Sequence, residues 1–422
     1  MKNFLLSYFR DDFVRHNAVF FLGSLAVSVL NYAYYPIISR FLSIEAFGEI
    51  QAYFSFAAQC GLIASVFGMI ILNIKANDTD DKLSEDTVGQ LYTLSTLLTS
   101  VVALGLILLA PFIGTALHLP SFAGFVLVAA TLLISVPRTF AKFHLQAQKM
   151  FMKVSITELL VSGGKIIFAF LFILAGTQVA GALAGLLVAT VLGLVYVYPF
   201  TKDTIGLARF TRLRFTPLIW RELRYGTLIL FATGFSTFLY TADIIVVRYF
   251  FDSQTAGLYA GIATVARIVV FATGSVAGVT IAHVKLKQTR EENHAIMHKA
   301  LLLVGLVSLG GLFIFFPFPV LVVHLLMGTR FLPLANLLPL LALLMAVVAL
   351  ANLFVMYFLA LRRYILIPVA IVSSLSIVIS TFFWHNTLNH IVTGFLAGIG
   401  LALVLMILLY IFEPSHALPS TE

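Results

Sequence analysis

Residues 332–361 read LPLANLLPLLALLMAVVALANLFVMYFLAL, a stretch that contains no Asp, Glu, Lys or Arg. A helix rises 1.5 Å per residue, so about 20 apolar residues are enough to cross the ~30 Å hydrocarbon core of a bilayer. Inside hydrocarbon, backbone amides must be satisfied within the segment, and a helix satisfies them. The stretch therefore predicts a membrane-spanning helix.

Segments of this kind recur along the whole chain. The other predicted spans are residues 17–40, 46–73, 88–113, 122–145, 154–175, 178–200, 225–250, 256–283, 300–326, 364–383 and 390–412. Of the 422 residues, 61% are hydrophobic and 10% are charged, whereas soluble domains have about 25% charged residues. We therefore expect an all-α integral membrane protein with about 12 transmembrane helices. The first span is too long to be a cleaved signal peptide.

The basic residues alternate between successive predicted loops. If the N-terminus is cytoplasmic, most of the 26 lysines and arginines fall on the cytoplasmic side, and the outer side receives Arg40, Arg248 and Arg330. This skew follows the positive-inside rule and predicts that both termini are cytoplasmic. The net charge of +8 then reflects membrane orientation, and no nucleic-acid partner is expected.

The longest basic loop, residues 201–224, divides the chain into residues 1–200 and 225–422, with six predicted spans in each half. The stretch RFLSIEAFGEIQA (Arg40–Ala52) and the stretch RYFFDSQTAGLYA (Arg248–Ala260) share an Arg, a polar helix start, a Gly and an Ala, with one residue inserted. Both stretches fall on the same side of the membrane, which predicts two parallel six-helix lobes.

Two basic residues lie deep within predicted spans. Lys165 follows Lys153 by about 18 Å of helix, and it faces a polar cavity, pairs with Glu158 on the same helix face or snorkels outward. Arg267 lies about 16 Å into its span, and either binds an anion or pairs with Asp243. Ionisable groups at such depths cost about 2.5–3.5 kcal/mol each and usually face water or a partner.

Other residues are weaker candidates. Asp243 and Glu158 are candidates for proton or sodium coupling, because burial raises the pKa of a carboxyl group; structural ion pairs are the alternative. Arg138, after Pro137, is either an anion contact or a topological signal. Tyr35, with Tyr32 and Tyr34, either contacts a ligand or belongs to an interfacial aromatic belt.

The stretch NYAYYPIISRFLSIEAFG (Asn31–Gly48) resembles the opening signature of the polysaccharide biosynthesis, or Wzx-type, oligosaccharide flippases. The stretch DIIVVRYFFDSQTAGLYA (Asp243–Ala260) is similar to the same family's seventh-span motif. The resemblance implies the fold of the multidrug/oligosaccharidyl-lipid/polysaccharide (MOP) superfamily, with two six-helix bundles around a central cavity that opens alternately to each side.

The resemblance also implies a cargo and a location. The cargo would be an undecaprenyl-pyrophosphate-linked oligosaccharide, the repeat unit of an O-antigen, capsule or exopolysaccharide, flipped to the outer leaflet of the bacterial inner membrane. With such a cargo, Arg138 would contact phosphate and Tyr35 would stack on sugars. A polysaccharide polymerase and glycosyltransferases are candidate partners beside the lipid bilayer. The sequence leaves open which glycan is carried and whether protons, sodium or polymerisation drives transport.

Two other functions compete with this one. A drug/cation antiporter would share the fold but favours an acidic cavity, whereas Arg138, Lys165 and Arg267 outnumber Glu158 and Asp243 within the spans. A membrane glycosyltransferase or polymerase needs a sizeable extramembrane part, but the predicted outward loops are short and carry no P-loop or HExxH motif. We therefore expect a transporter rather than an enzyme, without a metal or organic cofactor.

Overall fold

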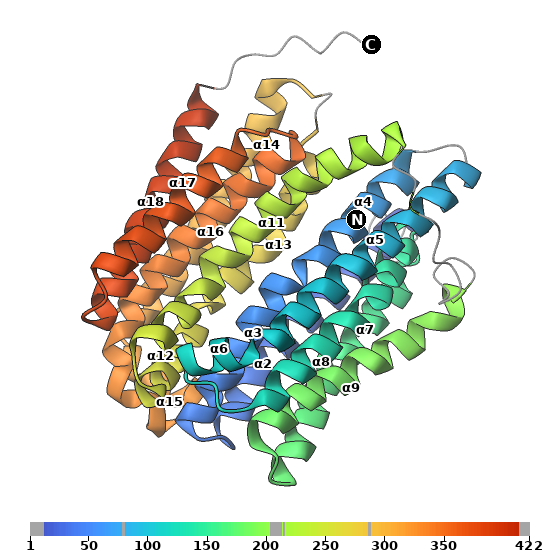
Figure 1. Cartoon of the computed structure of the whole chain (residues 1–422). Helices are drawn as coiled ribbons and strands as arrows, with labels where there is room; N and C mark the ends of the chain where they lie inside the picture. The colour runs from blue at the N-terminus through green and yellow to red at the C-terminus, as the bar shows by residue number, and fades with distance from the viewer. Residues whose placement is uncertain (1–11, 78–80, 203–212, 214–215, 286–287, 413–422) are drawn as a thin grey trace, which may run out of the picture. The chain divides into compact units, whose positions relative to one another are not determined.

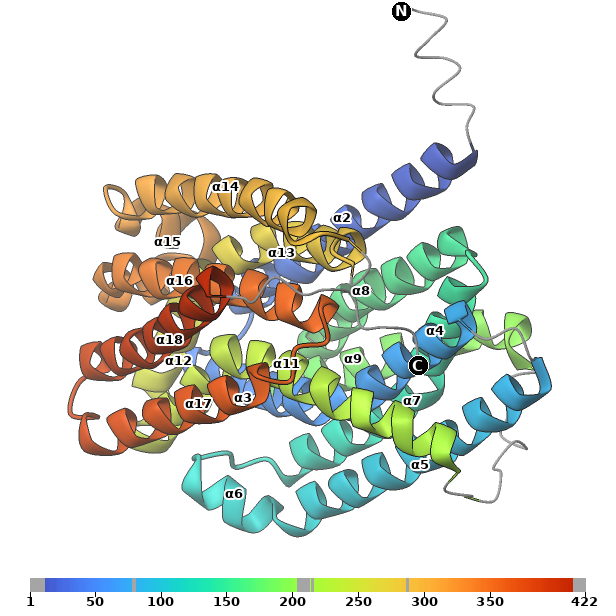
Figure 2. The same ribbon diagram turned by 90° about the horizontal axis from the view of Figure 1, so that it is seen from above.

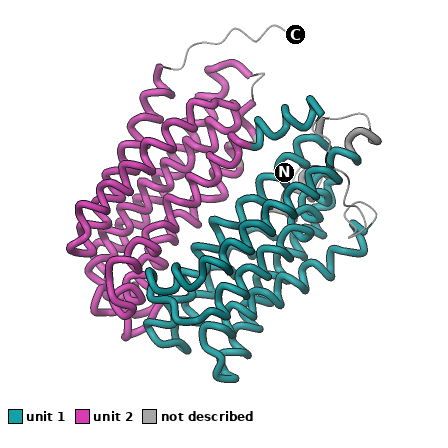
Figure 3. Tube along the Cα trace, in the orientation of Figure 1, with its two compact units in different colours: residues 1–226 teal, residues 227–422 magenta. Residues whose placement is uncertain are grey.

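The computed structural model describes residues 12–77, 81–202, 213, 216–285 and 288–412, and every regular element in these ranges is a helix (Figure 1). The expected all-α class is therefore confirmed. The chain divides into two compact units, residues 1–226 and 227–422 (Figure 3). Half of the predicted linker at 201–224 lies outside the described residues, and its last part, from Pro217, is already helical. The predicted parallel arrangement of two lobes remains a prediction.

The described residues of unit 1 form eight α-helices and the start of a ninth. They are α2 (Asp12–Ser39), α3 (Ile44–Cys60), α4 (Leu62–Asn77), α5 (Asp81–Leu108), α6 (Ala110–Ala116), α7 (Phe122–Ala147), α8 (Phe151–Leu174), α9 (Gln178–Val197), the 3-10 turn η1 (Tyr198–Phe200) and the first residues of α11 (Pro217–Phe250).

Unit 2 contains the rest of α11 and the helices that follow it. They are α12 (Ser253–Ala266), α13 (Ile268–His283), α14 (Arg290–Phe315), α15 (Pro319–Met327), the 3-10 segment η2 (Thr329–Leu337), α16 (Leu338–Ala360), α17 (Leu366–Phe383) and α18 (Leu388–Ile411).

Among the described residues, ten helical segments are long and apolar enough to span a membrane, and α12 with α13 makes an eleventh, bent by 42°. A membrane protein is therefore confirmed, with ten or eleven candidate spans against the expected number of about 12. Helix α2 occupies the position of the first predicted span, residues 17–40. The stretch 332–361 is not one α-helix, because it starts within η2, which contains Pro333.

The repeated stretches both begin helices. Ser43 accepts a hydrogen bond from the backbone N–H of Ala46 at the start of α3, and Asp252 accepts from the N–H groups of Gln254 and Thr255 at the start of α12. Such caps satisfy amides that would otherwise lack a partner. In both units the capped helix is followed by an interruption, at Gly61 after α3 and at Arg267 after α12.

Unit 1 is held together by close helix packing. Helices α8 and α9 pack side by side (Figure 2). A Cβ atom added to Gly185 would lie 2.4 Å from the backbone nitrogen of Ala169, and one added to Gly164 would lie 3.3 Å from the Cβ of Ala189. Close backbone approach through small residues is typical of membrane helices.

In unit 2, α16 forms the core. It packs against α13, α14 and α18, and most of its side chains are buried, among them Leu344, Met345 and Val348. Helix α14 is the opposite case, since a larger share of its side chains is exposed than in the other described candidate spans. An apolar, exposed helix face in a membrane protein is suited to contact with lipid.

Candidate functional site

Helix α8 of unit 1 buries a lysine next to aromatic rings. The Lys165 side chain is part of a residue only 7% exposed, and its Nζ donates a hydrogen bond to Asn31 Oδ1 of α2 at 2.9 Å. The same Nζ lies 4.5 Å from the centre of the Tyr34 ring, with the rings of Tyr35 and Phe54 at 5.9 and 6.0 Å. Aromatic faces attract cations electrostatically, so this environment accommodates the ammonium group.

Lys165 has no carboxylate within salt-bridge distance in the described part of the chain. The expected alternative, a pair with Glu158, is not observed, because Glu158 instead lies 2.9 Å from Arg138 Nη1 and 3.4 Å from Lys142 Nζ. Seven residues separate Glu158 from Lys165, or about 10 Å along the helix. The ammonium group of Lys165 is therefore stabilised by a hydrogen bond to a neutral amide and by cation–π contacts with aromatic rings.

Arg138 is placed by a bridge between helices α7 and α8. Its guanidinium and the ammonium of Lys142 share the carboxylate of Glu158, so two cations meet one anion. This ion-paired bridge between two helices is a structural explanation for the presence of Arg138 and Glu158 within the spans. The expected phosphate contact of Arg138 and the expected coupling role of Glu158 remain predictions.

Unit 2 contains a buried network of three side chains at the bend between α12 and α13. Arg267 Nη2 lies 2.7 Å from Asp243 Oδ1 of α11, and the Tyr259 hydroxyl donates to Asp243 Oδ2 at 3.0 Å. Asp243 and Tyr259 are fully buried and Arg267 is 6% exposed. The structural ion pair, one of the two expected alternatives for Arg267, is therefore present.

The network leaves one donor unused. Arg267 Nε is buried and has no hydrogen-bond partner among the described residues. Buried polar atoms usually have partners, and a guanidinium carries five donors in a planar fork. Arg267 thus holds Asp243 while keeping capacity for a further acceptor.

The aromatic cluster divides between two environments. Tyr34 is fully buried and packs edge-on against Tyr35, with ring centres 5.4 Å apart, so an interfacial belt does not explain Tyr34. Tyr35 is half-buried and lies on the Lys165 side of α2. The structure brings Asn31, Tyr34, Tyr35 and Lys165 together in unit 1.

Several features were missed or misplaced from sequence. Arg248, expected in an outer loop, is in the last turn of α11 and 2% exposed. Glu222 is buried beside Asn73, 3.4 Å away, and Arg221. His294 and His298 were overlooked although they are four residues apart on α14. An Asp-x-Asp triplet, residues 78–80, was also overlooked and lies outside the described residues.

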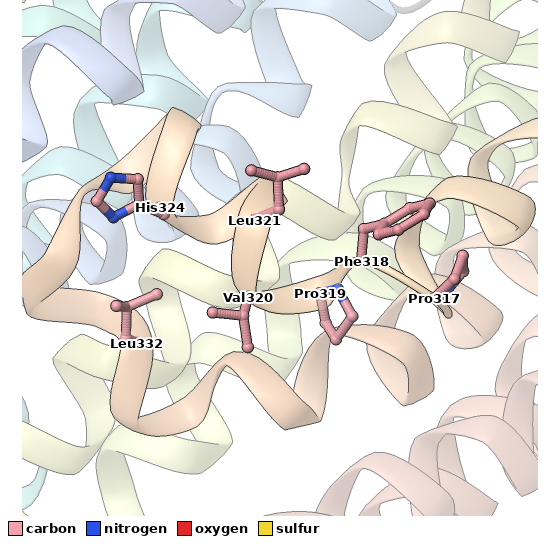
Figure 4. Close-up of a pocket in the computed structure, with 7 residues that line it drawn as sticks. All are labelled: Pro317, Phe318, Pro319, Val320, Leu321, His324 and Leu332. Carbon is pink, nitrogen blue, oxygen red and sulfur yellow. The ribbon is translucent and has the colours of Figure 1, made fainter.

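The described residues contain no group of three or more His, Cys, Asp or Glu side chains arranged to hold a metal ion. A groove of about 570 Å³ lies in unit 2 around α15 (Figure 4). It is lined by Pro317, Phe318, Pro319, Val320, Leu321, His324 and Leu332. None of the candidate residues lines this groove.

The fold matches solved structures of membrane transporters. An inward-facing multidrug resistance MATE family transporter of the MOP superfamily is 13% identical, with a TM-score of 0.71 over 93% of this chain and 97% of that one. The eukaryotic MATE transporter AtDTX14 is 15% identical, with a TM-score of 0.63 over 96% and 97%. A MOP superfamily transporter from Pyrococcus furiosus, whose binding pocket is described as having reverse polarity, is 16% identical, with a TM-score of 0.60 over 95% and 94%.

These similarities, together with the spans, define the class: a multi-pass membrane protein with the MATE-like fold of the MOP transporters. The family model described as polysaccharide biosynthesis protein matches residues 13–281. The chain belongs to this family, which confirms the resemblance seen in its sequence. No curated protein matches the chain.

Proposed function

We propose that this protein flips an undecaprenyl-pyrophosphate-linked oligosaccharide from the cytoplasmic to the outer leaflet of the bacterial inner membrane by alternating access. Both termini would lie in the cytoplasm, and a polysaccharide polymerase or glycosyltransferases would act on the same glycan. The observation that carries the proposal is Lys165, a buried cation without an acidic partner among the described residues.

The chemistry of the cargo fits this residue. An ammonium group removed from water is costly unless an anion or strong dipoles replace its hydration. The neutral amide of Asn31 replaces part of it, and Asn31 itself is exposed. An incoming pyrophosphate could therefore reach Lys165 by displacing one side chain, and the exchange would strengthen the interaction, because hydrogen bonds between charged groups are stronger than those to neutral ones.

The aromatic neighbours suit the rest of the headgroup. Tyr34 and Tyr35 lie beside the ammonium group, and aromatic side chains offer sugars a flat apolar surface as well as a hydroxyl group. The Tyr34 hydroxyl is buried without a hydrogen-bond partner among the described residues. A sugar hydroxyl at this position would give it one.

The network in unit 2 supplies the candidate for coupling. Protonation of Asp243 would remove the negative charge that holds Arg267, and the guanidinium would then be free to bind an anion. Arg267 already has an unused donor in Nε. In this scheme the proton on Asp243 releases Arg267, and the cargo phosphate then binds the released guanidinium. Arg267 and Asp243 would therefore contribute to transport together.

The second candidate function is a small-molecule exporter of the drug/cation antiporter type, which the likeness to multidrug MATE transporters favours. A buried ammonium group would repel an organic cation, so such an exporter should work better without Lys165. The two functions therefore predict opposite effects of the same substitution.

The test is transport of a lipid-linked oligosaccharide by the full-length protein, measured as glycan display at the cell surface at matched protein levels. Lys165→Gln should lower display by at least about tenfold, the equivalent of 1.4 kcal/mol, whereas Lys165→Arg should retain much of it. Lys153→Gln, on the same helix, is the matched control and should leave display unchanged. Full display in Lys165→Gln would overturn the role of this cation, and drug resistance gained by that variant would favour the exporter.

A further inference from the structure

The overlooked histidines belong to a cluster of basic and aromatic side chains in unit 2. Arg290, His294 and His298 are spaced four residues apart, so they follow one face of α14 for two turns. The His294 ring stacks on Tyr410 of α18, with ring centres 4.2 Å apart. Tyr357 of α16 lies 5.4 Å from Tyr410 and 6.5 Å from His294.

The cluster lies where three helices reach the same end of unit 2. Arg290 Nη2 donates to the carbonyl oxygen of Ile411 at 2.9 Å, which joins the first residue of α14 to the last residue of α18. Arg290 Nε also lies 3.5 Å from His294 Nε2. The charge skew between loops assigns this end to the cytoplasmic side.

An apolar stripe continues directly from the cluster. Leu302, Leu306, Leu309 and Phe313 follow His298 at intervals of three or four residues, and each is at least 59% exposed. From His298 to Phe313 the helix extends about 22 Å, most of the thickness of the ~30 Å hydrocarbon core. His298 and the exposed Lys299 lie just before the predicted span 300–326, so we expect them at the depth of the lipid headgroups.

The charges at this boundary favour an anion. Glu292 is turned back to the backbone N–H of Thr289 in a capping box, so it does not neutralise the histidines. The charged or titratable groups near the two imidazoles are Arg290, Glu291 and Lys299 on α14, Tyr357 on α16 and Tyr410 on α18. Positive groups predominate around the histidines. Each lysine or arginine near a membrane surface raises the affinity for anionic lipid by about fivefold.

We propose that Arg290, His294, His298 and Lys299 bind the anionic phosphate headgroup of a membrane lipid in the cytoplasmic leaflet, whose acyl chain lies along the stripe from Leu302 to Phe313. This site is separate from Lys165 and requires no glycan. Its binding can therefore be measured independently of the proposed transport function.

The experiment measures lipid binding to the purified full-length protein in nanodiscs, with phosphatidylglycerol and phosphatidylcholine as probes. Phosphatidylglycerol should bind more tightly. The exposed pair His298→Gln, Lys299→Gln should lose roughly fivefold in phosphatidylglycerol affinity at low salt for the lysine charge removed. A control pair at the other end of unit 2, Arg330→Gln with His390→Gln, should change nothing.

The outcomes separate the possible ligands. Equal binding of the two lipids, or unchanged binding by the His298→Gln, Lys299→Gln variant, would overturn the proposal. Inorganic pyrophosphate that binds as tightly as the lipid would also overturn it, because the apolar stripe would then contribute nothing.

Discussion

Asp243 of α11 and Arg267 at the bend between α12 and α13 form a buried ion pair, with 2.7 Å between Asp243 Oδ1 and Arg267 Nη2. A buried pair can contribute little net stability, yet removal of one partner leaves the other charged and desolvated. The pair therefore makes the bend in this span sensitive to the charge of one carboxylate.

The first prediction follows from this asymmetry. Asp243→Ala or Arg267→Ala alone should destabilise the protein by roughly 3–5 kcal/mol, measured by thermal unfolding in detergent. The double substitution Asp243→Asn, Arg267→Gln should be milder than either single alanine variant, because no unpaired charge remains. Equal losses in all three variants would show that packing, rather than charge, is what the residues supply.

The second prediction concerns the neutral partner of Lys165. Asn31→Asp would place a carboxylate where the amide oxygen now lies 2.9 Å from Nζ. The resulting ion pair should occupy the ammonium group and lower glycan transport as strongly as Lys165→Gln, with little change in unfolding temperature. Asn31→Ala should be milder, since it leaves the cation available. Normal transport by Asn31→Asp would contradict an anion-binding role for Lys165.

The class of fold was predictable because hydrophobic length is decisive in a membrane. Runs such as residues 332–361 cannot be accommodated in a water-soluble surface, and the helix starts at Ser43 and Asp252 follow from polar residues that cap amides. The interruptions at Gly61 and Arg267 were not predicted, because both segments remain apolar enough to pass as single spans.

The partners within the candidate site were less predictable. Lys165 and Glu158 share a helix face, but Glu158 is drawn to Arg138 and Lys142 on the neighbouring α7. Which helix lies beside α8 depends on tertiary packing, which periodicity does not specify. The stacking of His294 on Tyr410 was not predictable for the same reason, because these residues are 116 positions apart in the chain and only tertiary packing brings them together.

The third prediction tests the contact between α8 and α9. Gly185→Val should destabilise unit 1, because even a Cβ atom at this position would lie 2.4 Å from the Ala169 backbone nitrogen, and overpacking typically costs 1–3 kcal/mol or more. Gly163→Ala is the matched control on α8, since no atom lies within 4 Å of its added Cβ. Thermal unfolding should separate the two variants, and similar midpoints would contradict the close packing.

The fourth prediction concerns pH and the cap at Asp252. Hydrogen bonds from the Thr255 side chain and from the backbone N–H groups of Gln254 and Thr255 stabilise the carboxylate and lower the pKa of Asp252 below its usual value. Because this pKa is lowered on folding, the charged cap stabilises the folded state at pH values above the pKa of Asp in the unfolded chain, about 3.9. The stabilisation is lost as the pH falls through the lower pKa of Asp252 in the folded state.

The Asp252→Ala variant should therefore be less stable at pH 7 by about 0.5–2 kcal/mol, and the difference from the wild type should shrink below about pH 4. Unfolding midpoints measured across that range supply the test. Asp252→Asn, which can still cap, should lie between the two. A difference between wild type and Asp252→Ala that does not change with pH would mean that the charge of the cap is irrelevant.

The last prediction concerns membrane orientation, on which the cytoplasmic assignment of the Arg290 cluster also depends. The skew of basic residues between loops predicts that both termini and the 201–224 loop are cytoplasmic. Reporter fusions after residues 120, 210 and 422 should therefore read outside, inside and inside. Residue 120 follows α6, between the third and fourth predicted spans. Three predicted spans separate it from residue 210, so the fusions at these two residues should report opposite sides of the membrane. An outside signal at residue 210 would reverse the orientation, and it would move the proposed lipid headgroup site to the outer leaflet.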